Sequence, residues 1–410
     1  MPPPPKLAAA LLLSLTAGHA HAAPPTVLYN FDNGTGWAPY GSLLAVTSDR
    51  LYGTTFVGGT HNDGIVFELS AASASSSVWT ETVLTSFNNA TIGEYPNGNL
   101  IADHLGNLYG TLYEGTASGF GAVFQLSPPA AANAPWTETT LVTFTGANGQ
   151  YPLGSLIRMS GKYYGTTYQG GVSGNGIVFE LAPPSAGHPA WSETVLTSFT
   201  GTNGQYPLGS LIADSAGNLY GTTERGGSSN DGTVFKLAPP ISPQTAWTES
   251  VLFTFTGTNG EFPHGSLIKD SAGNFYGTTG NGGGTSCYQG CGTVFELSPP
   301  VAPQTAWTQT ILTAFTGTNG EIPEGSLVAD SAGNLYGTTS AGGADSNGTV
   351  FKLARPTVSH PTWITSVLTS FNGTNGAAPA GSLIIIGGKL FGTAVGGGPC
   401  NCGTVYKLAR

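Results

Sequence analysis

The chain has 410 residues, a formal net charge of −10 and only 12 Lys plus Arg, which form no basic stripe. Nucleic acid and anionic membrane surfaces are therefore poor partners for it, and we expect neither. Although 62 residues are glycine and only 8% are charged, 10% are aromatic, a composition that argues against disorder and for a folded domain with many turns.

The N-terminus has the pattern of a secretory signal. Lys6 precedes an apolar run from Leu7 to Ala17, and Ala20-His21-Ala22 offers a small-residue cleavage site, so we expect residues 1–22 to be removed as a signal peptide. The run is too short for a permanent transmembrane helix, and no later segment approaches the ~20 apolar residues that one needs. We expect residues 23–410 to form a single secreted or extracytoplasmic domain, in the periplasm or at the cell surface.

One sequence unit recurs seven times after an isolated strand-like segment, Val27-Leu28-Tyr29-Asn30-Phe31. Each unit carries, with small variations, Pro-x-Gly-Ser-Leu, Tyr-Gly-Thr-Thr, a Gly-Gly loop, Gly-x-Val-Phe and a Trp segment that ends in Val-Leu-x-x-Phe. The units begin near residues 39, 96, 152, 207, 263, 323 and 379. The glycines of the Gly-Ser-Leu step are Gly41, Gly98, Gly154, Gly209, Gly265, Gly325 and Gly381. A period of about 56 residues is typical of an array or a propeller.

The fourth unit shows which elements each repeat should contain. Four strands are predicted, at residues 209–213, 219–223, 232–237 and 247–255. Asp214 to Asn218, between the first two, has the residue types that tight hairpin turns require. Pro239-Pro240 ends the third strand, because proline cannot donate to a sheet ladder. No helical period persists anywhere in the unit.

These repeats predict an all-β fold, a seven-bladed β-propeller whose blades are four-stranded antiparallel sheets. The last unit ends at Val405-Tyr406-Lys407-Leu408 without a Trp segment, whereas residues 27–31 have no unit of their own. We therefore expect the N-terminal strand to complete blade seven. Closure of this kind leaves no exposed ladder between the first and last blades.

The amino-acid sequence of the repeat unit resembles that of a known family. Gly-Ser-Leu-Ile-Ala-Asp-Ser-Ala-Gly-Asn-Leu-Tyr-Gly-Thr-Thr, followed by Gly-Gly and Gly-Thr-Val-Phe-Lys-Leu, is similar to the repeat of the bacterial GloVer tandem-repeat family. The resemblance covers all seven units. It implies an exported repeat protein that is secreted or associated with the cell surface, and it implies no particular reaction.

Aromatic residues recur at two fixed places in the units. Six are the repeat tryptophans Trp79, Trp136, Trp191, Trp247, Trp307 and Trp363. The others are the Tyr-Gly-Thr-Thr tyrosines Tyr52, Tyr109, Tyr164, Tyr220, Tyr276 and Tyr336, with Phe391 in the last unit. A ladder for sugar stacking is one interpretation of the tryptophans. Since a residue present in every unit serves what all units share, we expect both sets to pack between blades.

The four cysteines lie in two Gly-rich loops, as Cys287-x-x-x-Cys291 and Cys400-x-Cys402. Three pairings are possible. Local bridges are favoured because units five and seven are not neighbours, although Cys400 and Cys402 are close for a disulfide. A metal site would need thiolates from both loops without a nearby histidine, so we expect no metal and no cofactor.

Candidate ligand-binding residues are those that differ between units at the face where the inter-blade connections and the second loops open. One position follows the repeat proline: Tyr40, Asn97, Leu153, Leu208, His264, Glu324 and Ala380. The other follows Tyr-Gly-Thr-Thr: Phe56, Tyr113, Tyr168, Glu224, Gly280, Ser340 and Val395. Together they predict an aromatic sector with Tyr40, Phe56, Tyr113 and Tyr168, and a polar sector with Glu224, Arg225, His264 and Glu324.

An aromatic sector opposite a polar one suits a neutral polymer such as a polysaccharide. The leading hypothesis is a secreted, monomeric, non-enzymatic protein that binds an extracellular polysaccharide or protein through this face. A second hypothesis is a polysaccharide hydrolase or lyase, with Glu224 and Glu324 as acid and base and His264 as an alternative proton carrier. The third is a purely structural surface protein.

Overall fold

The computed structural model of the protein describes residues 24–32, 34–72, 78–131 and 134–410. The predicted signal peptide, residues 1–22, lies outside this part of the chain. The described residues form strands, turns and loops. Among them, no helix is long and apolar enough to cross a membrane.

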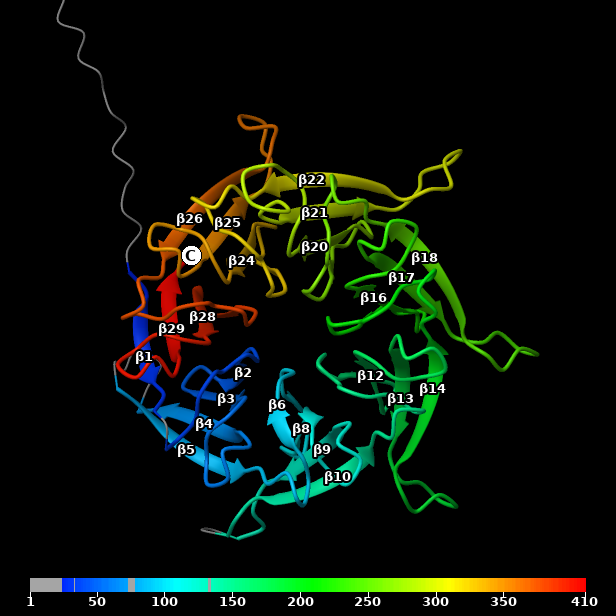
Figure 1. The fold of residues 1–410 in the computed structure, drawn as a ribbon, viewed down its shortest axis with the longest axis vertical. Helices are drawn as coiled ribbons and strands as arrows, with labels where there is room; N and C mark the ends of the chain where they lie inside the picture. Colours follow the sequence, from blue (N-terminus) through cyan, green and yellow to red (C-terminus); the bar gives the residue numbers. More distant parts are fainter. Residues whose placement is uncertain (1–23, 33, 73–77, 132–133) are drawn as a thin grey trace, which may run out of the picture.

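Seven antiparallel sheets stand radially around one axis and form a closed ring (Figure 1). Blade 1 contains β2 (Leu44–Thr47), β3 (Arg50–Thr55), β4 (Ile65–Ala71) and β5 (Trp79–Ser86). Blade 2 contains β7 (Ile101–Ala102), β8 (Leu108–Glu114), β9 (Ala122–Ser127) and β10 (Thr137–Thr143), and β6 (Glu94–Pro96) also pairs with β8. Blade 3 contains β11 (Ile157–Met159), β12 (Lys162–Thr167), β13 (Ile177–Ala182) and β14 (Ser192–Ser198).

The remaining blades repeat this order. Blade 4 contains β15 (Ile212–Ala213), β16 (Leu219–Thr223), β17 (Thr233–Ala238) and β18 (Thr248–Thr254). Blade 5 contains β19 (Ile268–Lys269), β20 (Phe275–Thr279), β21 (Thr293–Ser298) and β22 (Thr308–Ala314). Blade 6 contains β23 (Val328–Ala329), β24 (Leu335–Thr339), β25 (Thr349–Ala354) and β26 (Ile364–Ser370). Blade 7 contains β27 (Ile384–Ile386), β28 (Lys389–Ala394), β29 (Thr404–Ala409) and β1 (Thr26–Asn30). The predicted seven-bladed propeller is confirmed.

The N-terminal strand closes the ring as the sequence predicts. In Figure 1, β1 at the blue end of the chain runs beside β29 at the red end. Thr26 pairs with Lys407 and Asn30 with Thr404, and a register shift falls between Val27 and Tyr29. The outer strand of blade 4 has its register shift opposite Val234 and Phe235, at the same place in the ladder. The borrowed strand thus reproduces the outer strand of an ordinary blade, including its bulge.

The innermost strands are shorter than predicted. The first strand of unit four spans Ile212–Ala213, not residues 209–213. Its glycine and serine do not pair with the next strand of their own blade. They turn toward the axis, where the backbone N–H of Ser210 donates to the Oγ of Ser266 in blade 5, at 2.8 Å. Contacts between blades therefore replace ladder pairing at this step.

The core lies between the blades. Each of its seven clusters joins residues of two neighbouring sheets, as where Tyr164 and Val178 of blade 3 meet Phe235 and Leu237 of blade 4. All four side chains are buried. A blade has an apolar layer on both faces, so it is stable only with a neighbour on each side.

The repeat aromatics pack between blades, which confirms that prediction. The ring of Trp191 in blade 3 lies 6.3 Å from that of Tyr109 in blade 2, and Trp247 in blade 4 lies 6.2 Å from Tyr164 in blade 3. Trp79, which faces Phe391 of blade 7, is only 5% exposed, whereas the other five repeat tryptophans are half-buried. The Tyr-Gly-Thr-Thr tyrosines and Phe391 are all buried.

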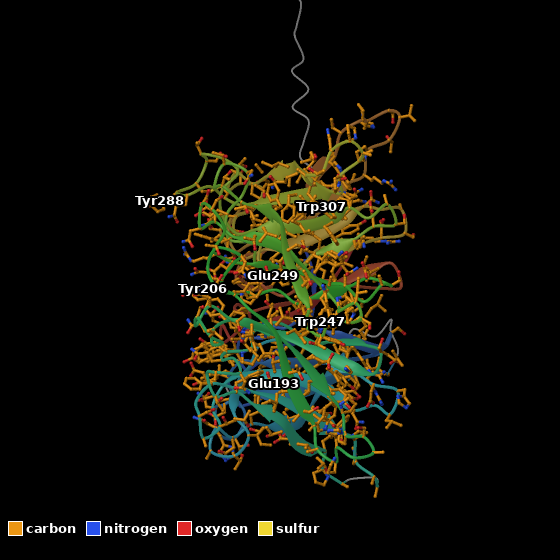
Figure 2. The ribbon with its side chains drawn as sticks, turned by 90° about the vertical axis from the view of Figure 1, so that its right-hand side faces the viewer. Glu193, Tyr206, Trp247, Glu249, Tyr288 and Trp307 are labelled. Atoms are coloured by element: carbon orange, nitrogen blue, oxygen red, sulfur yellow. A yellow bond between two sulfur atoms is a disulfide. The ribbon has the colours of Figure 1, made fainter. Side chains whose placement is uncertain are left out.

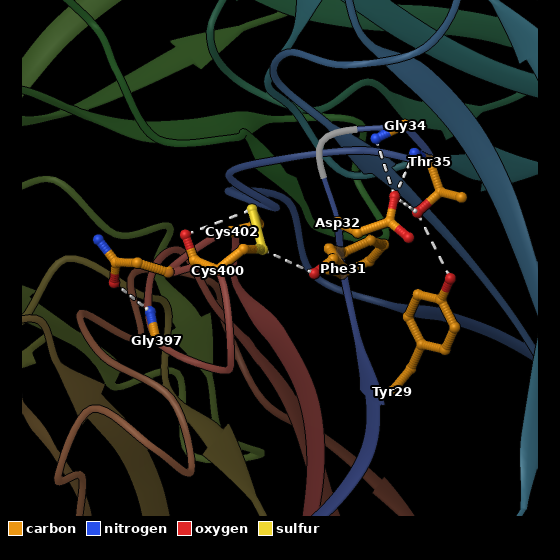
Figure 3. The surroundings of a disulfide bond; sticks show 9 residues. Tyr29, Phe31, Asp32, Gly34, Thr35, Gly397, Cys400 and Cys402 are labelled. Carbon is orange, nitrogen blue, oxygen red and sulfur yellow. Dashed lines mark hydrogen bonds between the residues drawn. A yellow bond between two sulfur atoms is a disulfide. The ribbon is translucent and has the colours of Figure 1, made fainter.

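Both disulfides are local, as favoured from the sequence: Cys287 with Cys291 and Cys400 with Cys402. Figure 3 shows the second bridge next to Phe31, the residue that follows β1. The carbonyl oxygen of Phe31 lies 3.1 Å from the Sγ of Cys400, and the N–H of Phe31 donates to the carbonyl of Gly403. This loop therefore holds the N-terminal segment where the ring closes.

Candidate functional site

A narrow polar channel opens at the axis, and its lining comes from all seven blades. Its volume is about 90 Å³. The residue after the repeat proline lines it in every unit: Tyr40, Asn97, Leu153, Leu208, His264, Glu324 and Ala380. The sequence-predicted position thus lies around the axis. The serines of the Gly-Ser-Leu steps, with Asn99 in blade 2, also line the channel.

The glycine of each Gly-Ser-Leu step lets neighbouring backbones approach closely at this wall. A Cβ placed on Gly209 would lie 3.0 Å from the carbonyl oxygens of both Gly265 and His264 in blade 5. The hydroxyl of Thr222 also donates to the carbonyl of Gly265, at 3.5 Å. Steric exclusion of a side chain, rather than a special backbone angle, therefore accounts for glycine here.

The residue before the repeat proline has a left-handed backbone in every blade. These residues, with φ between 50° and 62°, are Ala38, Tyr95, Tyr151, Tyr206, Phe262, Ile322 and Ala378. Large side chains rarely adopt this conformation, which costs on the order of 1 kcal/mol or more at each position. The backbone carbonyl of Tyr206 accepts a hydrogen bond from the N–H of Glu224 at 3.0 Å, so this turn fixes both residues at the loop face.

On this face, stacked aromatic rings join blade 1 to blade 2, blade 2 to blade 3, and blade 3 to blade 4. Phe56 stacks on Tyr95 with ring centroids 4.7 Å apart, and Tyr113 stacks on Tyr151 at 4.9 Å. Tyr168 stacks on Tyr206 at 4.8 Å. Figure 2 labels Tyr206 at the same edge of the disc as Tyr288 of the first disulfide loop. Each stacked pair joins one blade to the next, so the aromatic surface spans the boundaries between these blades.

A pocket of about 390 Å³ lies on the aromatic side of the channel mouth. The four predicted aromatic residues and three residues that follow the repeat proline line it: Tyr40, Phe56, Tyr113, Tyr168, Asn97, Leu153 and Leu208. The structure thus brings the aromatic sector together in one cavity. Burial raises the pKa of Tyr113 and Tyr40, so both phenols stay protonated and can donate hydrogen bonds at neutral pH.

The polar sector is divided into two groups. The carboxylate of Glu224 accepts a hydrogen bond from the Tyr168 hydroxyl at 2.9 Å and lies 3.7 Å from the Arg225 guanidinium. The Arg225 guanidinium carbon lies 4.2 Å from the ring centroid of Phe262. Both charged side chains are thus engaged by protein partners, and they border the aromatic surface at blade 4.

His264 and Glu324 form the second group, at the channel mouth. Burial raises the pKa of Glu324, and the nearby His264 opposes this shift. Gly280 leaves room for the histidine, since a Cβ there would lie 3.2 Å from its Cε1. A buried carboxyl group with a raised pKa beside an imidazole can exchange protons with a ligand.

The proposed pair of Glu224 and Glu324 does not share a cavity. Glu324 lines the channel, and Glu224 belongs to neither the channel nor the aromatic pocket as delineated in the described residues. The other titratable residues in the channel lining are His264 and Tyr40. Within the described part of the chain, no group of three or more His, Cys, Asp or Glu residues could hold a metal ion.

Sequence reasoning missed the residues that precede the repeat proline. Tyr95, Tyr151 and Tyr206 supply half of each stacked pair, and Phe262 contacts Arg225. Their signal was present in the sequence, because this position is aromatic in units two to five and aliphatic in the others. It varies around the ring in the same way as the two positions that the sequence did single out.

Comparison with solved structures shows the fold. A protein assigned as a 6-phosphogluconolactonase from Bacteroides uniformis superposes with a TM-score of 0.53 at 13% identity, covering 86% of this chain and 89% of its own. A puromycin hydrolase has a TM-score of 0.56 at 9% identity, and a puromycin-hydrolyzing peptidase of Mycobacterium tuberculosis 0.54 at 10%. Both matches cover 95% of this chain. They cover 55% of the puromycin hydrolase and 54% of the peptidase, so this chain spans about half the length of either protein.

Comparison of the sequence with protein-family models gives a match over most of the chain. The family model of the Gloeobacter/Verrucomicrobia repeat matches residues 13–190, 187–329 and 284–410. No curated protein matches the chain.

Proposed function

Since the chain belongs to the Gloeobacter/Verrucomicrobia repeat family, we propose that it is a secreted propeller that binds a neutral extracellular polysaccharide at its loop face. The observation that carries this proposal is the pocket of about 390 Å³ lined by Tyr40, Phe56, Tyr113 and Tyr168. Flat aromatic side chains contact the C–H faces of sugar rings, and Asn97 and the phenols supply hydrogen bonds to hydroxyl groups.

The charges around the pocket favour an uncharged ligand. The chain has a net charge of −10, and Glu324 lies at the channel mouth beside the pocket, so an anionic polymer would be repelled. Arg225, which borders the aromatic sector, is engaged with Glu224 and Phe262. The two disulfides fit an oxidising compartment and support secretion.

A second candidate function is polysaccharide cleavage at the same face. His264 and Glu324 lie together at the channel mouth, and the raised pKa of Glu324 suits a general acid. The proposed acid and base pair of Glu224 and Glu324 is less suited to it, because Glu224 is held by Tyr168 and Arg225. A hydrolase or lyase would therefore depend on His264 and Glu324.

The test is a glycan array and calorimetric titration with the mature chain and three variants. Tyr113→Ala should weaken binding of a neutral oligosaccharide at least tenfold, because one face of the pocket is lost. Tyr288→Ala is the matched control, since Tyr288 lies on the same face but is 92% exposed and outside the pocket lining. Equal losses in both variants would contradict the proposed site.

The same samples test the enzymatic alternative. Release of reducing ends or unsaturated products by the wild type, abolished in Glu324→Gln, would establish cleavage. Binding without product release would favour a purely binding role. Neither binding nor product release with any neutral glycan would leave a structural surface protein.

A further inference from the structure

A ring of six serines and one asparagine surrounds the channel, and hydrogen bonds link its members from blade 1 to blade 7. The backbone N–H of Ser42 donates to Asn99 Oδ1 at 2.6 Å, and that of Asn99 donates to Ser155 Oγ at 2.7 Å. The same contact continues through Ser155, Ser210, Ser266, Ser326 and Ser382, each time at 2.8 Å. Six hydrogen bonds thus join the seven blades in sequence.

This ring leaves hydroxyl hydrogens without a protein acceptor. A serine hydroxyl has one O–H donor and two lone pairs. In blades 3 to 7 the hydroxyl uses one lone pair to accept the N–H of the preceding blade, and within the described residues its own hydrogen has no acceptor. The channel wall therefore contains hydroxyl groups that remain able to donate to a ligand.

Ser42, at the junction with blade 7, is the exception that points to a ligand. Its side chain lines the channel, its residue is only 5% exposed, and its Oγ has no hydrogen-bond partner among the described residues. A buried hydroxyl with no partner carries a desolvation cost that a ligand or water oxygen would relieve.

The channel and the aromatic pocket are continuous. Tyr40, Asn97, Leu153 and Leu208 line both of them. The channel volume of about 90 Å³ is too small for a sugar ring but holds a hydroxymethyl group or a few waters, given roughly 30 Å³ for a water in the liquid. A ligand seated in the pocket can therefore extend a short polar arm to the serine ring.

We propose that the axial serine ring is the polar subsite of the loop-face pocket, where it binds the exocyclic hydroxyl of a neutral hexose residue. This inference rests on the proposed function and specifies its substrate class. A hydroxyl accepts from the free O–H donors and donates to their remaining lone pairs, so it satisfies both sides of the ring. A carboxylate or sulfate arm would meet Glu324 in the same lining.

The proposal is tested by saturation-transfer NMR with hexoses and their 6-deoxy counterparts: glucose with quinovose, galactose with fucose, and mannose with rhamnose, each pair in the same enantiomeric series. We expect at least one hexose to bind more tightly than its 6-deoxy partner. Ser42→Ala should weaken that hexose about 3- to 10-fold, the effect of one neutral hydrogen bond, without weakening the 6-deoxy sugar.

Thermal melting separates this role from a structural one. Because the Ser42 hydroxyl has no protein partner, Ser42→Ala should melt at the wild-type temperature or above it. Ser210→Ala should melt lower, since the N–H of Ser155 loses its acceptor. Ser215→Ala, in an exposed hairpin turn, is the control expected to change neither melting nor binding.

The possible outcomes bear differently on the two proposals. Hexose binding that is lost in Tyr113→Ala but equal in Ser42→Ala and wild type would overturn the subsite and leave the proposed function standing. Equal binding of each hexose and its 6-deoxy partner would do the same. Failure of all three hexoses and of the neutral glycans on the array would overturn both.

Discussion

The junction of blades 2 and 3 and the junction of blades 7 and 1 use the same repeat positions but make different contacts. At the first, half-buried Trp191 meets Tyr109, Glu193 accepts from Asn148 at 2.8 Å, and Asn99 donates to Ser155. At the second, buried Trp79 meets Phe391, and Glu81 accepts from the Tyr29 hydroxyl at 2.7 Å. At the axis there, Ser42 Oγ has no described partner.

This difference shows how a ring can be closed without covalent continuity inside one blade. The closing blade is held by the ladder of β1 with β29, by a more deeply buried tryptophan on its neighbour, and by a tyrosine of β1 that reaches the next blade. The contact to the serine hydroxyl at the axis is the feature that the closing junction lacks, although the Thr393 hydroxyl still donates to the carbonyl of Gly41 there at 3.1 Å. Stability at this junction therefore comes from apolar burial, the contacts of β1 and the hydrogen bond of Thr393, while the Ser42 hydroxyl is left for a ligand.

Removal of the closing strand should have the largest effect. Deletion of residues 26–31 removes buried Leu28 and Phe31 and leaves blade 7 with three strands. The lost burial alone exceeds about 5 kcal/mol, which is comparable to the whole stability of many domains. We expect aggregation or a melting temperature far below that of the wild type. Deletion of the exposed loop residues 241–246 is the control, and equal melting of both proteins would contradict ring closure.

The tryptophans at the two junctions should differ in their contribution to stability. Trp79→Ala should lower the free energy of unfolding by roughly 3–5 kcal/mol, as for a large buried aromatic. Trp191→Ala should cost less, about 1–3 kcal/mol, because the side chain is half-buried. Urea unfolding of both variants measures the difference. A larger loss in Trp191→Ala would show that the closing junction is not the more tightly packed one.

The axial glycines should behave alike at both kinds of junction. A Cβ on Gly209 would lie 3.0 Å from backbone oxygens of blade 5, and one on Gly381 would lie 3.0 Å from the carbonyl of Tyr40 in blade 1. Substitution of either by alanine should cost about 1–3 kcal/mol through overpacking. Gly284→Ala is the control, since no atom lies within 4 Å of its Cβ. Chemical denaturation of the three variants should separate the axial pair from the control.

The carboxylates of the outer strands, such as Glu193 in β14, should have the smallest effect on stability, and this effect depends on pH. Burial raises the pKa of Glu193 above its ordinary value of 4.5. The folded state then binds more protons than the unfolded state just above that pH, so stability falls as pH rises through this window. Glu193→Gln should stabilise the protein by less than about 1 kcal/mol at pH 7 and hardly at all below pH ~4.

Blade 5 supplies the reverse experiment. Gln309 occupies in blade 5 the position that Glu193 occupies in blade 3, and its side chain donates to the carbonyl of Asn259 at 2.7 Å. Gln309→Glu should destabilise the protein at pH 7, with a smaller loss in acid, where the carboxyl is protonated. Melting curves for both variants between pH 4 and pH 8 measure the effect. A gain in Gln309→Glu at neutral pH would contradict the burial argument.

The fold was predictable because each repeat carries its own turn and strand signals. Ring closure was predicted from the Trp segment that the last unit lacks and from residues 27–31, which belong to no unit. Both features can be read directly from the sequence. The shortness of the inner strands was not predictable in this way. Gly209 and Ser210 have strand-compatible neighbours. Only the approach of blade 5 at the axis makes the N–H of Ser210 donate to Ser266 instead.

The candidate site was predictable in part, for a related reason. Variation around a repeat identifies exposed positions, and it led to Tyr40, Phe56, Tyr113 and Tyr168, which line one pocket. It could not reveal that Tyr168 holds Glu224, because this contact joins two blades through side-chain directions. The unpartnered hydroxyl of Ser42 was hidden for the opposite reason, since its residue is the same as in most other units.

The most direct test of the account is a crystal structure of the mature chain with the neutral oligosaccharide that binds most tightly on the array. We predict a sugar ring against Tyr40 and Tyr113, with its exocyclic oxygen within hydrogen-bond distance of Ser42 Oγ. A sugar bound instead on the outer strands or on the opposite face of the disc, with the aromatic pocket empty, would contradict it.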